Sequence, residues 1–297
     1  MEDFLIRRIK FSTFAIGIRN YTRNSVDIIG SGFYYDTRGY FLSAGHVLRK
    51  VKEIQKENEI SSIKSEMVTI NTDSVDNRFV VKAYKIEDIL LPETPKEVTN
   101  PTAPIISDLG IGRIKQETEK RPFLKIKQAP DFTEPHIHVG EEVVLCGYPA
   151  GEQSLSFTVD RFQGLRFSPV MQFGHISALL PSDDSIPYGI QTDILSTGGS
   201  SGSSIVSIKT GEVVAIAQKI IVTYAEVNVP EKAQRKTRMP EKLQGFAHIG
   251  LIYGDSFNMF NKVPDMTKDD FSKGIGGVTS PTYTQGHVRP EYRLHRD

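Results

Sequence analysis

The 297-residue sequence has a single cysteine, no excess of either charge and no long apolar run. Cys146 cannot form an internal disulfide, and the apolar run at 143–145 indicates a buried, inert thiol. Lys and Arg together number 36, as do Asp and Glu, so no overall basic field would gather nucleic acid. No stretch approaches membrane-spanning length, and the start lacks the layout of a secretory signal. We therefore expect a cytoplasmic protein in a reducing compartment, with neither nucleic acid nor a membrane as partner.

The remaining composition is that of a globular protein, with 38% hydrophobic and 24% charged residues. Short segments rich in β-branched and aromatic residues, bounded by turn formers, predict strands. They lie at 13–19, 32–36, 40–44, 67–70, 79–84, 109–114, 122–126, 142–148, 173–180, 188–195, 205–208, 213–222 and 244–252. Only 47–57 has helical spacing in the first half. Many short strands in two comparable sets predict an all-β fold of two packed barrels.

The predicted strands also divide the chain. An N-terminal barrel is expected over residues 1–130 and a C-terminal barrel over 131–263. From about residue 264 the composition shifts to Gly, Thr, Pro, Tyr and charged residues, with few aliphatic side chains. Such a segment buries too little apolar surface to fold alone, so residues 264–297 are predicted to form a flexible tail.

The most distinctive stretch is 197–204, which reads Thr-Gly-Gly-Ser-Ser-Gly-Ser-Ser between two apolar regions. Glycine accepts positive φ and lets a ligand approach the main chain closely. The amides of Gly199 and Ser201 can then converge on one point, as donors to a developing oxyanion must. Alone, such a cluster is far more often an ordinary turn or linker than a catalytic site.

A catalytic serine needs a general base, usually a histidine that a carboxylate orients. His46 follows the predicted strand 40–44, at the rim of a barrel. Asp108 lies inside the otherwise apolar run 105–112, where a carboxylate is costly unless it has a partner. The chain order His46, Asp108, Ser201 is that of the chymotrypsin arrangement.

Three sequence blocks surround these residues. The first is Gly30-Ser31-Gly32-Phe33 followed by Gly39-Tyr40-Phe41-Leu42-Ser43-Ala44-Gly45-His46-Val47. The second is Ser107-Asp108-Leu109-Gly110-Ile111, and the third is Gln191-Thr192-Asp193 followed by Gly199-Ser200-Ser201-Gly202-Ser203. Together with shorter matches at 140, 147–149, 174–178, 211–216 and 245–247, they resemble trypsin-like serine peptidases of the chymotrypsin fold. The resemblance covers roughly residues 28–252 and is nearest to the HtrA-type branch, without disulfides.

The resemblance implies two packed six-stranded antiparallel barrels and a serine endopeptidase that hydrolyses protein or peptide substrates through an acyl-enzyme. It implies that His46 is the base, Asp108 its orienting carboxylate and Ser201 the nucleophile. The amides of Gly199, Ser200 and Ser201 would form the oxyanion hole, with no metal and no organic cofactor. The implied substrate-binding residues are Leu195, Ser196, Thr197, Gly198, Phe246, Ala247 and His248.

Several positions depart from the family pattern. Gly45 replaces a small alanine before the histidine, Ser203 stands where glycine is common, and Ser204 replaces a proline. Ser200 stands where relatives activated by cleavage have an aspartate, so that mode of activation is not expected. The PDZ module that often follows the protease in the HtrA branch is not expected here, because few residues follow the matching region. None of these changes removes a catalytic atom.

Other interpretations of individual residues stay open. Ser200, Ser203 and Ser204 are competing nucleophiles, although only Ser201 has the Gly-x-Ser-Gly frame. His136 and His138 could be metal ligands or exposed linker residues. His175 and His248 could lie in the core or in a pocket. The charged run 231–238 could be a solvated loop or a contact for an acidic partner.

Two other functions also fit the sequence. A catalytically silent module could use the same fold to hold an extended peptide or a partner protein. Alternatively, the protease could be inactive until a partner protein orders its loops. Segments 151–172 and 223–243 exceed the usual loop lengths of compact domains, and such loops are frequently functional.

Overall fold

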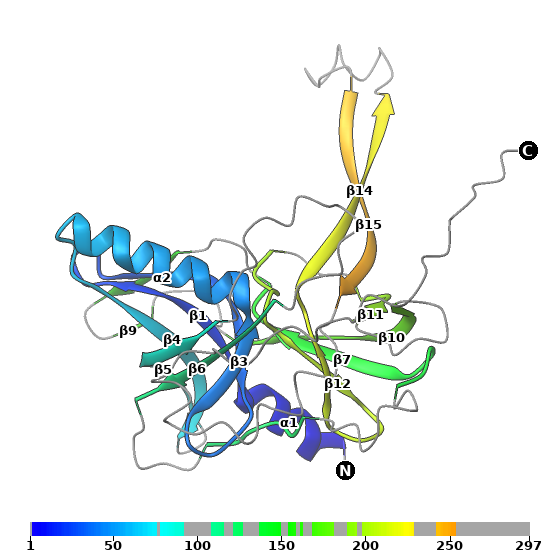
Figure 1. Ribbon diagram of the computed structural model, residues 1–297, viewed down its shortest axis with the longest axis horizontal. Coiled ribbons are helices and arrows are strands. Elements are labelled where there is room, and N and C mark those ends of the chain that lie inside the picture. Colours follow the sequence, from blue (N-terminus) through cyan, green and yellow to red (C-terminus); the bar gives the residue numbers. More distant parts are fainter. Residues whose placement is uncertain are drawn as a thin grey trace, which may run out of the picture.

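The computed structural model describes residues 2–75, 78–91, 108–115, 121–126, 137–149, 154–158, 161–162, 168–180, 189–194, 198–228 and 242–253. These residues form mostly strands, together with two helices, α1 (Glu2–Ser12) and α2 (Gly45–Ile60). Two bodies of strands lie side by side, and α1 sits at their junction (Figure 1). The predicted tail at 264–297 and the charged run 231–238 lie outside the described residues.

The first body is a closed six-stranded antiparallel barrel. Its strands are β1 (Thr13–Asn20), β2 (Ser25–Tyr34), β3 (Tyr40–Ala44), β4 (Ser65–Val75), β5 (Arg78–Leu90) and β6 (Leu109–Ile114). They pair in the order β1-β4-β5-β6-β3-β2, and pairing of β1 with β2 closes the ring. The alternating residues Phe14, Ile16 and Ile18 are at most 1% exposed, as burial of one strand face predicts. Helix α2 buries Val47, Leu48 and Val51 in the same core.

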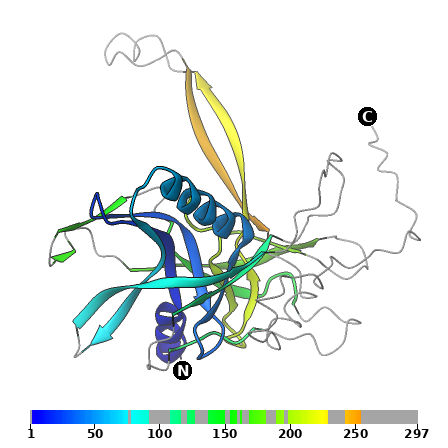
Figure 2. The ribbon, with the colours of Figure 1, turned by 60° about the vertical axis from the view of Figure 1, so that its left-hand side comes forward.

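The second body is a half-barrel. It contains β7 (Glu142–Gly147), β10 (Val170–Leu180), β11 (Gly189–Thr192), β12 (Ser204–Ser207) and β13 (Val213–Ile216), in the order β11-β10-β7-β12-β13. Strands β14 (Lys219–Asn228) and β15 (Lys242–Tyr253) pair with each other as a hairpin that projects from the body (Figures 1 and 2). The all-β, chymotrypsin-like prediction is therefore confirmed, with a half-barrel and a hairpin in place of a second closed six-stranded barrel.

The predicted strand 213–222 is interrupted between β13 and the next strand, β14, where Ala217 bonds to the serine-rich turn. The Ala217 amide donates to the Ser203 carbonyl at 2.9 Å, and its own carbonyl accepts from Gly202 at 2.7 Å. Both partners belong to the serine-rich turn, so the chain leaves the sheet there before it starts β14. The segment expected as a loop at 223–243 accordingly begins and ends inside strands β14 and β15.

The expected insertion at 151–172 also contains strands. Within it lie β8 (Ser154–Thr158), β9 (Arg161–Phe162) and the first residues of β10. Strand β8 pairs with β2 through Ser25↔Ser156, Val26↔Leu155 and Asp27↔Ser154. Part of the second half of the sequence therefore extends the sheet of the first barrel.

Residues 122–126 do not form the predicted strand. Their backbone bonds alternate between the two bodies: the Leu124 amide donates to the Tyr34 carbonyl at 2.9 Å, and the Val213 amide donates to Lys125 at 2.8 Å. Pro122 has no N–H to give to a ladder. A segment that divides its bonds in this way connects two sheets rather than extending one.

Helix α1 was not predicted, and it packs where the two bodies meet. Ile9 is fully buried in a core cluster with Phe33 of the first barrel and Val206 and Val213 of the second. Arg8 Nη2 donates to the Gly211 carbonyl at 2.8 Å. The apolar residues of this helix do not keep to one face, since Phe4 is 73% exposed, which is why periodicity did not reveal it.

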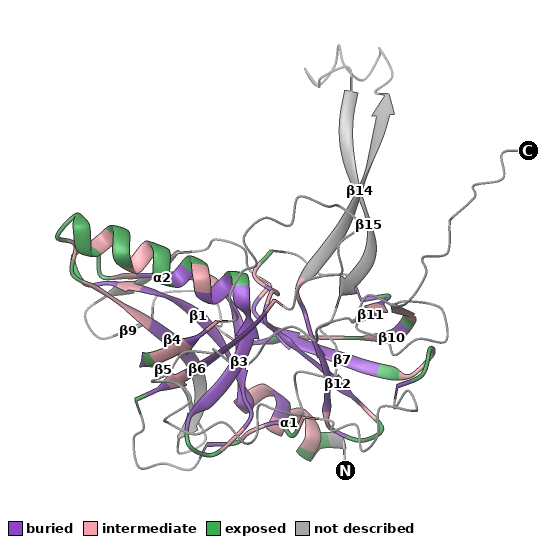
Figure 3. Ribbon diagram, viewed as in Figure 1, coloured by how far each residue is buried: buried purple, intermediate pink, exposed green. Residues whose placement is uncertain are grey.

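Both bodies have a continuous interior, seen in purple in Figure 3. Cys146 lies in the shared core and is fully buried, as predicted, and burial raises the pKa of its thiol to about 12. Neither described helix has the length and apolar character needed to cross a bilayer.

We predict that Ile9→Ala lowers the free energy of unfolding by about 2–5 kcal/mol, because it opens a cavity between the two bodies. Ile60→Ala is the control, because Ile60 is 76% exposed and its truncation should have little effect. Chemical denaturation of the two variants measures both values. Equal stabilities would contradict the structural role assigned to α1.

Candidate active site

Asp108 is held against the start of α2. Strand β3 ends at Ala44, which pairs with Leu109, so the residue before β6 meets the first turn of the helix. The Gly45 amide donates to the Asp108 carbonyl at 2.6 Å, and the His46 amide donates to Asp108 Oδ1 at 2.8 Å. These amides have no partner inside the helix, and a carboxylate there is favoured by the helix dipole.

The side chains of His46 and Asp108 are also in contact. His46 Nδ1 hydrogen-bonds Asp108 Oδ2. The Asp108 side chain is 20% exposed and the His46 side chain 46%. The carboxylate therefore holds His46 by both its backbone amide and its ring, and the ring nitrogen it engages is Nδ1.

Asp108 has a further partner, Arg49, that the sequence analysis did not predict. Arg49 Nη2 donates to Asp108 Oδ1 at 2.5 Å. The signal in the sequence is its position three residues after His46, which places both side chains on one face of the helix. Gly45 makes room for this contact, since a Cβ there would lie 2.9 Å from Asp108 Oδ1 and 3.3 Å from Arg49 Nη1.

Ser201 occupies the second position of a four-residue turn. The Ser203 amide donates to the Ser200 carbonyl at 3.0 Å, and Gly202 has φ of +87°. Positive φ at this third position is what a type II turn requires, and glycine adopts it without strain. A Cβ on Gly202 would also lie 2.1 Å from the Ser31 carbonyl oxygen.

The turn is hydrogen-bonded to the first barrel through Ser31. The Ser31 amide donates to the Ser201 carbonyl at 2.8 Å, and Ser31 Oγ donates to the Gly199 carbonyl at 2.9 Å. The same Oγ accepts the Tyr148 amide at 2.9 Å. One fully buried hydroxyl thus joins three segments from both bodies.

These contacts bring Ser201 to the neighbourhood of His46. A Cβ on Gly30 would touch both the Ser201 carbonyl oxygen, at 3.0 Å, and Val47 Cγ2, at 2.6 Å. Val47 directly follows His46, so the serine turn lies against the start of α2. Among the described residues, no hydrogen bond links Ser201 Oγ to the His46 ring.

Burial separates Ser201 from its serine neighbours. Ser200 is 1% exposed, and Ser203 and Ser204 are fully buried, whereas Ser201 is partly exposed. Ser203 fits because Gly147 faces it: a Cβ on Gly147 would lie 1.7 Å from Ser203 Oγ. Of these four hydroxyls, Ser201 is the one that a substrate can reach.

The predicted substrate-binding residues are only partly covered. Gly198 is exposed beside the turn, whereas Leu195, Ser196 and Thr197 lie outside the described residues. Phe246, Ala247 and His248 are on β15, opposite Tyr224, Thr223 and Val222 of β14, and only their backbone is described. Strand β15 also lies beside β11, so the hairpin base is near the end of the half-barrel.

A second histidine–carboxylate pair was missed by the sequence reasoning. The His175 amide donates to Asp193 Oδ1 at 2.6 Å, and His175 Nδ1 lies 3.3 Å from Asp193 Oδ2. His175 pairs with Glu142 at one end of β7. The serine turn lies at the other end, directly before Ser204, which pairs with Cys146. The side chain of His175 is 52% exposed, so it is not a core residue.

The metal-site hypothesis receives no support from the described part of the chain. His138 is exposed, and His136 lies outside the described residues. No group of three or more histidine, cysteine or acidic side chains suited to a metal occurs among the residues that the structure describes.

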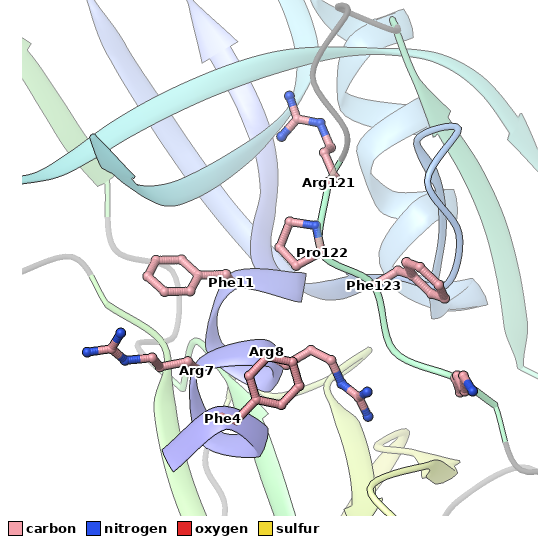
Figure 4. Close-up of a pocket in the computed structure, with 8 residues that line it drawn as sticks. Phe4, Arg7, Arg8, Phe11, Arg121, Pro122 and Phe123 are labelled. Carbon is pink, nitrogen blue, oxygen red and sulfur yellow. The ribbon is translucent and has the colours of Figure 1, made fainter. Parts of the chain in front are cut away.

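A pocket of about 480 Å³ opens on the α1 side of the molecule (Figure 4). Aromatic rings and a proline form much of its lining, and cationic side chains surround them. The lining residues are Phe4, Arg7, Arg8, Phe11, Arg121, Pro122, Phe123 and Lys125. Because none of them is a serine, histidine or carboxylate, this pocket is distinct from the His46–Asp108 site.

A closed barrel and a half-barrel, with a serine turn near a histidine–aspartate pair, define the chymotrypsin-like fold. The model of the trypsin-like peptidase domain family matches residues 30–216, which is more than half of the chain. The chain therefore belongs to the trypsin-like peptidase domain family, as the sequence blocks predicted. A chain in the crystal structure of Deg5 is similar, with a TM-score of 0.48 and 17% identity over 73% of this chain and 84% of that chain. No curated protein sequence matches.

We predict that Ser31→Ala lowers the free energy of unfolding by about 1–3 kcal/mol, because it leaves the buried Tyr148 amide and Gly199 carbonyl without their partner. Ser177→Ala is the matched control, since Ser177 is exposed. Denaturant titration of both variants measures the difference. A Ser31→Ala protein as stable as the control would contradict the assigned role of this hydroxyl.

Proposed function

We propose that the protein is a serine endopeptidase that hydrolyses peptide bonds of protein substrates. The observation that carries this proposal is the His46–Asp108 contact beside Ser201, the accessible serine of a glycine-shaped turn. Membership of the trypsin-like peptidase family supports it.

In the proposed mechanism, Asp108 accepts the Nδ1–H of His46 and so leaves Nε2 unprotonated. His46 takes the proton of Ser201 Oγ as that oxygen attacks the scissile carbonyl, and then returns it to the leaving amine. A water molecule attacks the resulting acyl-enzyme with His46 again as base. Asp108 stabilises the imidazolium in both steps.

The amides of Gly199 and Ser201, with that of Ser200, would hold the oxyanion. In support, the amides of Gly199 and Ser201 have no hydrogen-bond acceptor among the described residues, so both are available to a ligand. Gly199 has φ of +89°, a conformation that glycine adopts readily and that sets the direction of the neighbouring peptide groups. Loss of one such donor typically costs about 10²–10³ in rate.

The second candidate is a fold that binds a peptide without cleaving it, or that cleaves only when a partner protein is bound. The observation that favours it is the lack of a Ser201–His46 hydrogen bond among the described residues. A partner could supply that alignment only by binding the aligned state more tightly than the other.

We predict that a fluorophosphonate probe labels the protein and that Ser201→Ala abolishes labelling and peptide hydrolysis without unfolding the chain. Ser177→Ala should keep both. Gel fluorescence and a generic peptide assay measure the two effects. Absence of wild-type labelling under every condition would favour the silent module, and labelling only with an added partner would favour the gated protease. Near wild-type turnover in Ser201→Ala would exclude this serine as nucleophile.

We also predict a preference for small or medium apolar residues before the scissile bond. The position six before Ser201, which lines the base of the specificity pocket in this family, is Leu195 rather than a carboxylate. His248 is the reason to test acidic residues as well, because an imidazole in the pocket would favour them. Cleavage of an unbiased peptide library measures the preference, and dominant cleavage after Arg or Lys would refute both versions.

A further inference from the structure

The Asp108 carboxylate receives more donors than the orientation of one imidazole requires. Oδ2 meets the ring of His46, while Oδ1 accepts both the His46 amide and the Arg49 guanidinium. Bonds from a cation to a carboxylate are stronger than those between neutral groups. The Arg49 side chain is 32% exposed, so this ion pair is partly shielded from water.

No other described charge competes for this position. Of the charged residues whose side chains are described, the strands that contact α2 carry Arg19, Asp27, Glu66 and Arg113, and none of these forms an ion pair with His46, Arg49 or Asp108. Arg19 lies over the Tyr21 ring, Glu66 accepts from Tyr21, and Arg113 pairs with Asp88 and Glu87. On the helix itself, Lys50 and Glu53 make no ion pair with the three groups. Within the described residues, the electrostatic partners of Asp108 are therefore His46 and Arg49.

Gly45 is an independent sign that this contact is built into the chain. An alanine Cβ at that position would crowd both Asp108 Oδ1 and Arg49 Nη1, at 2.9 and 3.3 Å. The backbone of Gly45 does not have positive φ, so conformation alone does not require glycine here. The missing side chain instead leaves space for the ion pair.

We propose that Arg49 is a positioning residue of the active site. It fixes the Asp108 carboxylate so that Oδ2 faces His46 Nδ1. The inference rests on the proposed function for its catalytic consequence, but the coupling of Arg49 to His46 does not depend on activity. The competing explanation is an ion pair that only stabilises the first turn of α2.

The test compares Arg49→Met and Arg49→Lys with Lys52→Met, which removes an exposed cation from the same helix. Two quantities are measured: kcat and KM separately, and the NMR signal of the His46 Nδ1 proton, which reports the hydrogen bond to Asp108. The NMR spectra are recorded in a Ser201→Ala background, so they require no turnover. Circular dichroism and thermal unfolding report whether each variant folds.

For Arg49→Met we expect kcat to fall about tenfold with KM within about twofold, because the imidazole loses its fixed orientation. The signal of the His46 Nδ1 proton should shift or broaden, because Asp108 Oδ2 is no longer held in place. Arg49→Lys should restore this signal but only part of kcat, since an ammonium group is a point charge without a planar fork. Lys52→Met should behave as wild type.

A folded Arg49→Met protein with wild-type kcat and an unmoved His46 Nδ1 proton signal would overturn the proposal and leave a purely structural ion pair. If wild type shows no hydrolysis, the proposed function fails, whereas the NMR signal still decides the coupling. Should Arg49→Met not fold, Gly45→Ala tests the same contact without removing charge. It should lower kcat, and wild-type kcat in a folded Gly45→Ala protein would equally overturn the proposal.

Discussion

The site depends on one buried residue, Ser31, which connects the serine turn to the first barrel. Its amide and hydroxyl hold the carbonyls of Ser201 and Gly199, its hydroxyl also receives Tyr148, and its carbonyl accepts Ser43 Oγ at 2.7 Å. The amide and hydroxyl of Ser31 therefore bond across the boundary between the two bodies, whereas its carbonyl bonds within the first barrel. Because the turn belongs to the half-barrel and His46 to the closed barrel, the site exists only when the two are docked.

The sequence predicted most strands, and it predicted a partner for Asp108 because a carboxylate in an apolar run is costly alone. That the partner is His46 came from the family resemblance. The sequence did not predict α1, residues 122–126 or the open second body, because tertiary contacts decide each of them. Ile9 of α1 is buried against both bodies. Leu124 bonds to β2, whereas the next residue, Lys125, bonds to β13. Ala217 bonds to the serine turn. Local periodicity carries no information about such partners.

Comparison of the two histidine–aspartate pairs shows which part of the site is a local contact and which part depends on the docking of the two bodies. In both, glycine precedes the histidine, and the aspartate accepts the histidine amide through Oδ1. A Cβ on Gly174 would lie 2.3 Å from Asp193 Oδ1, as one on Gly45 would crowd Asp108. A histidine held by a carboxylate is thus a recurrent local structure in this chain. The adjacent serine turn is found at His46 and not at His175, and that difference comes from the docking of the two bodies.

The departures from the family motif are matched by the residues that face them. Gly45 stands where alanine is usual, and the space it leaves is occupied by Arg49 and Asp108. Ser203 adds a hydroxymethyl group beside the nucleophile, and that group fits only because Gly147 has no Cβ. In a close-packed interior an added or missing group is tolerated only where the facing residues leave or fill the space. Because Asp108 and Gly147 lie far from these positions in the chain, a motif departure can be interpreted only together with its spatial partner.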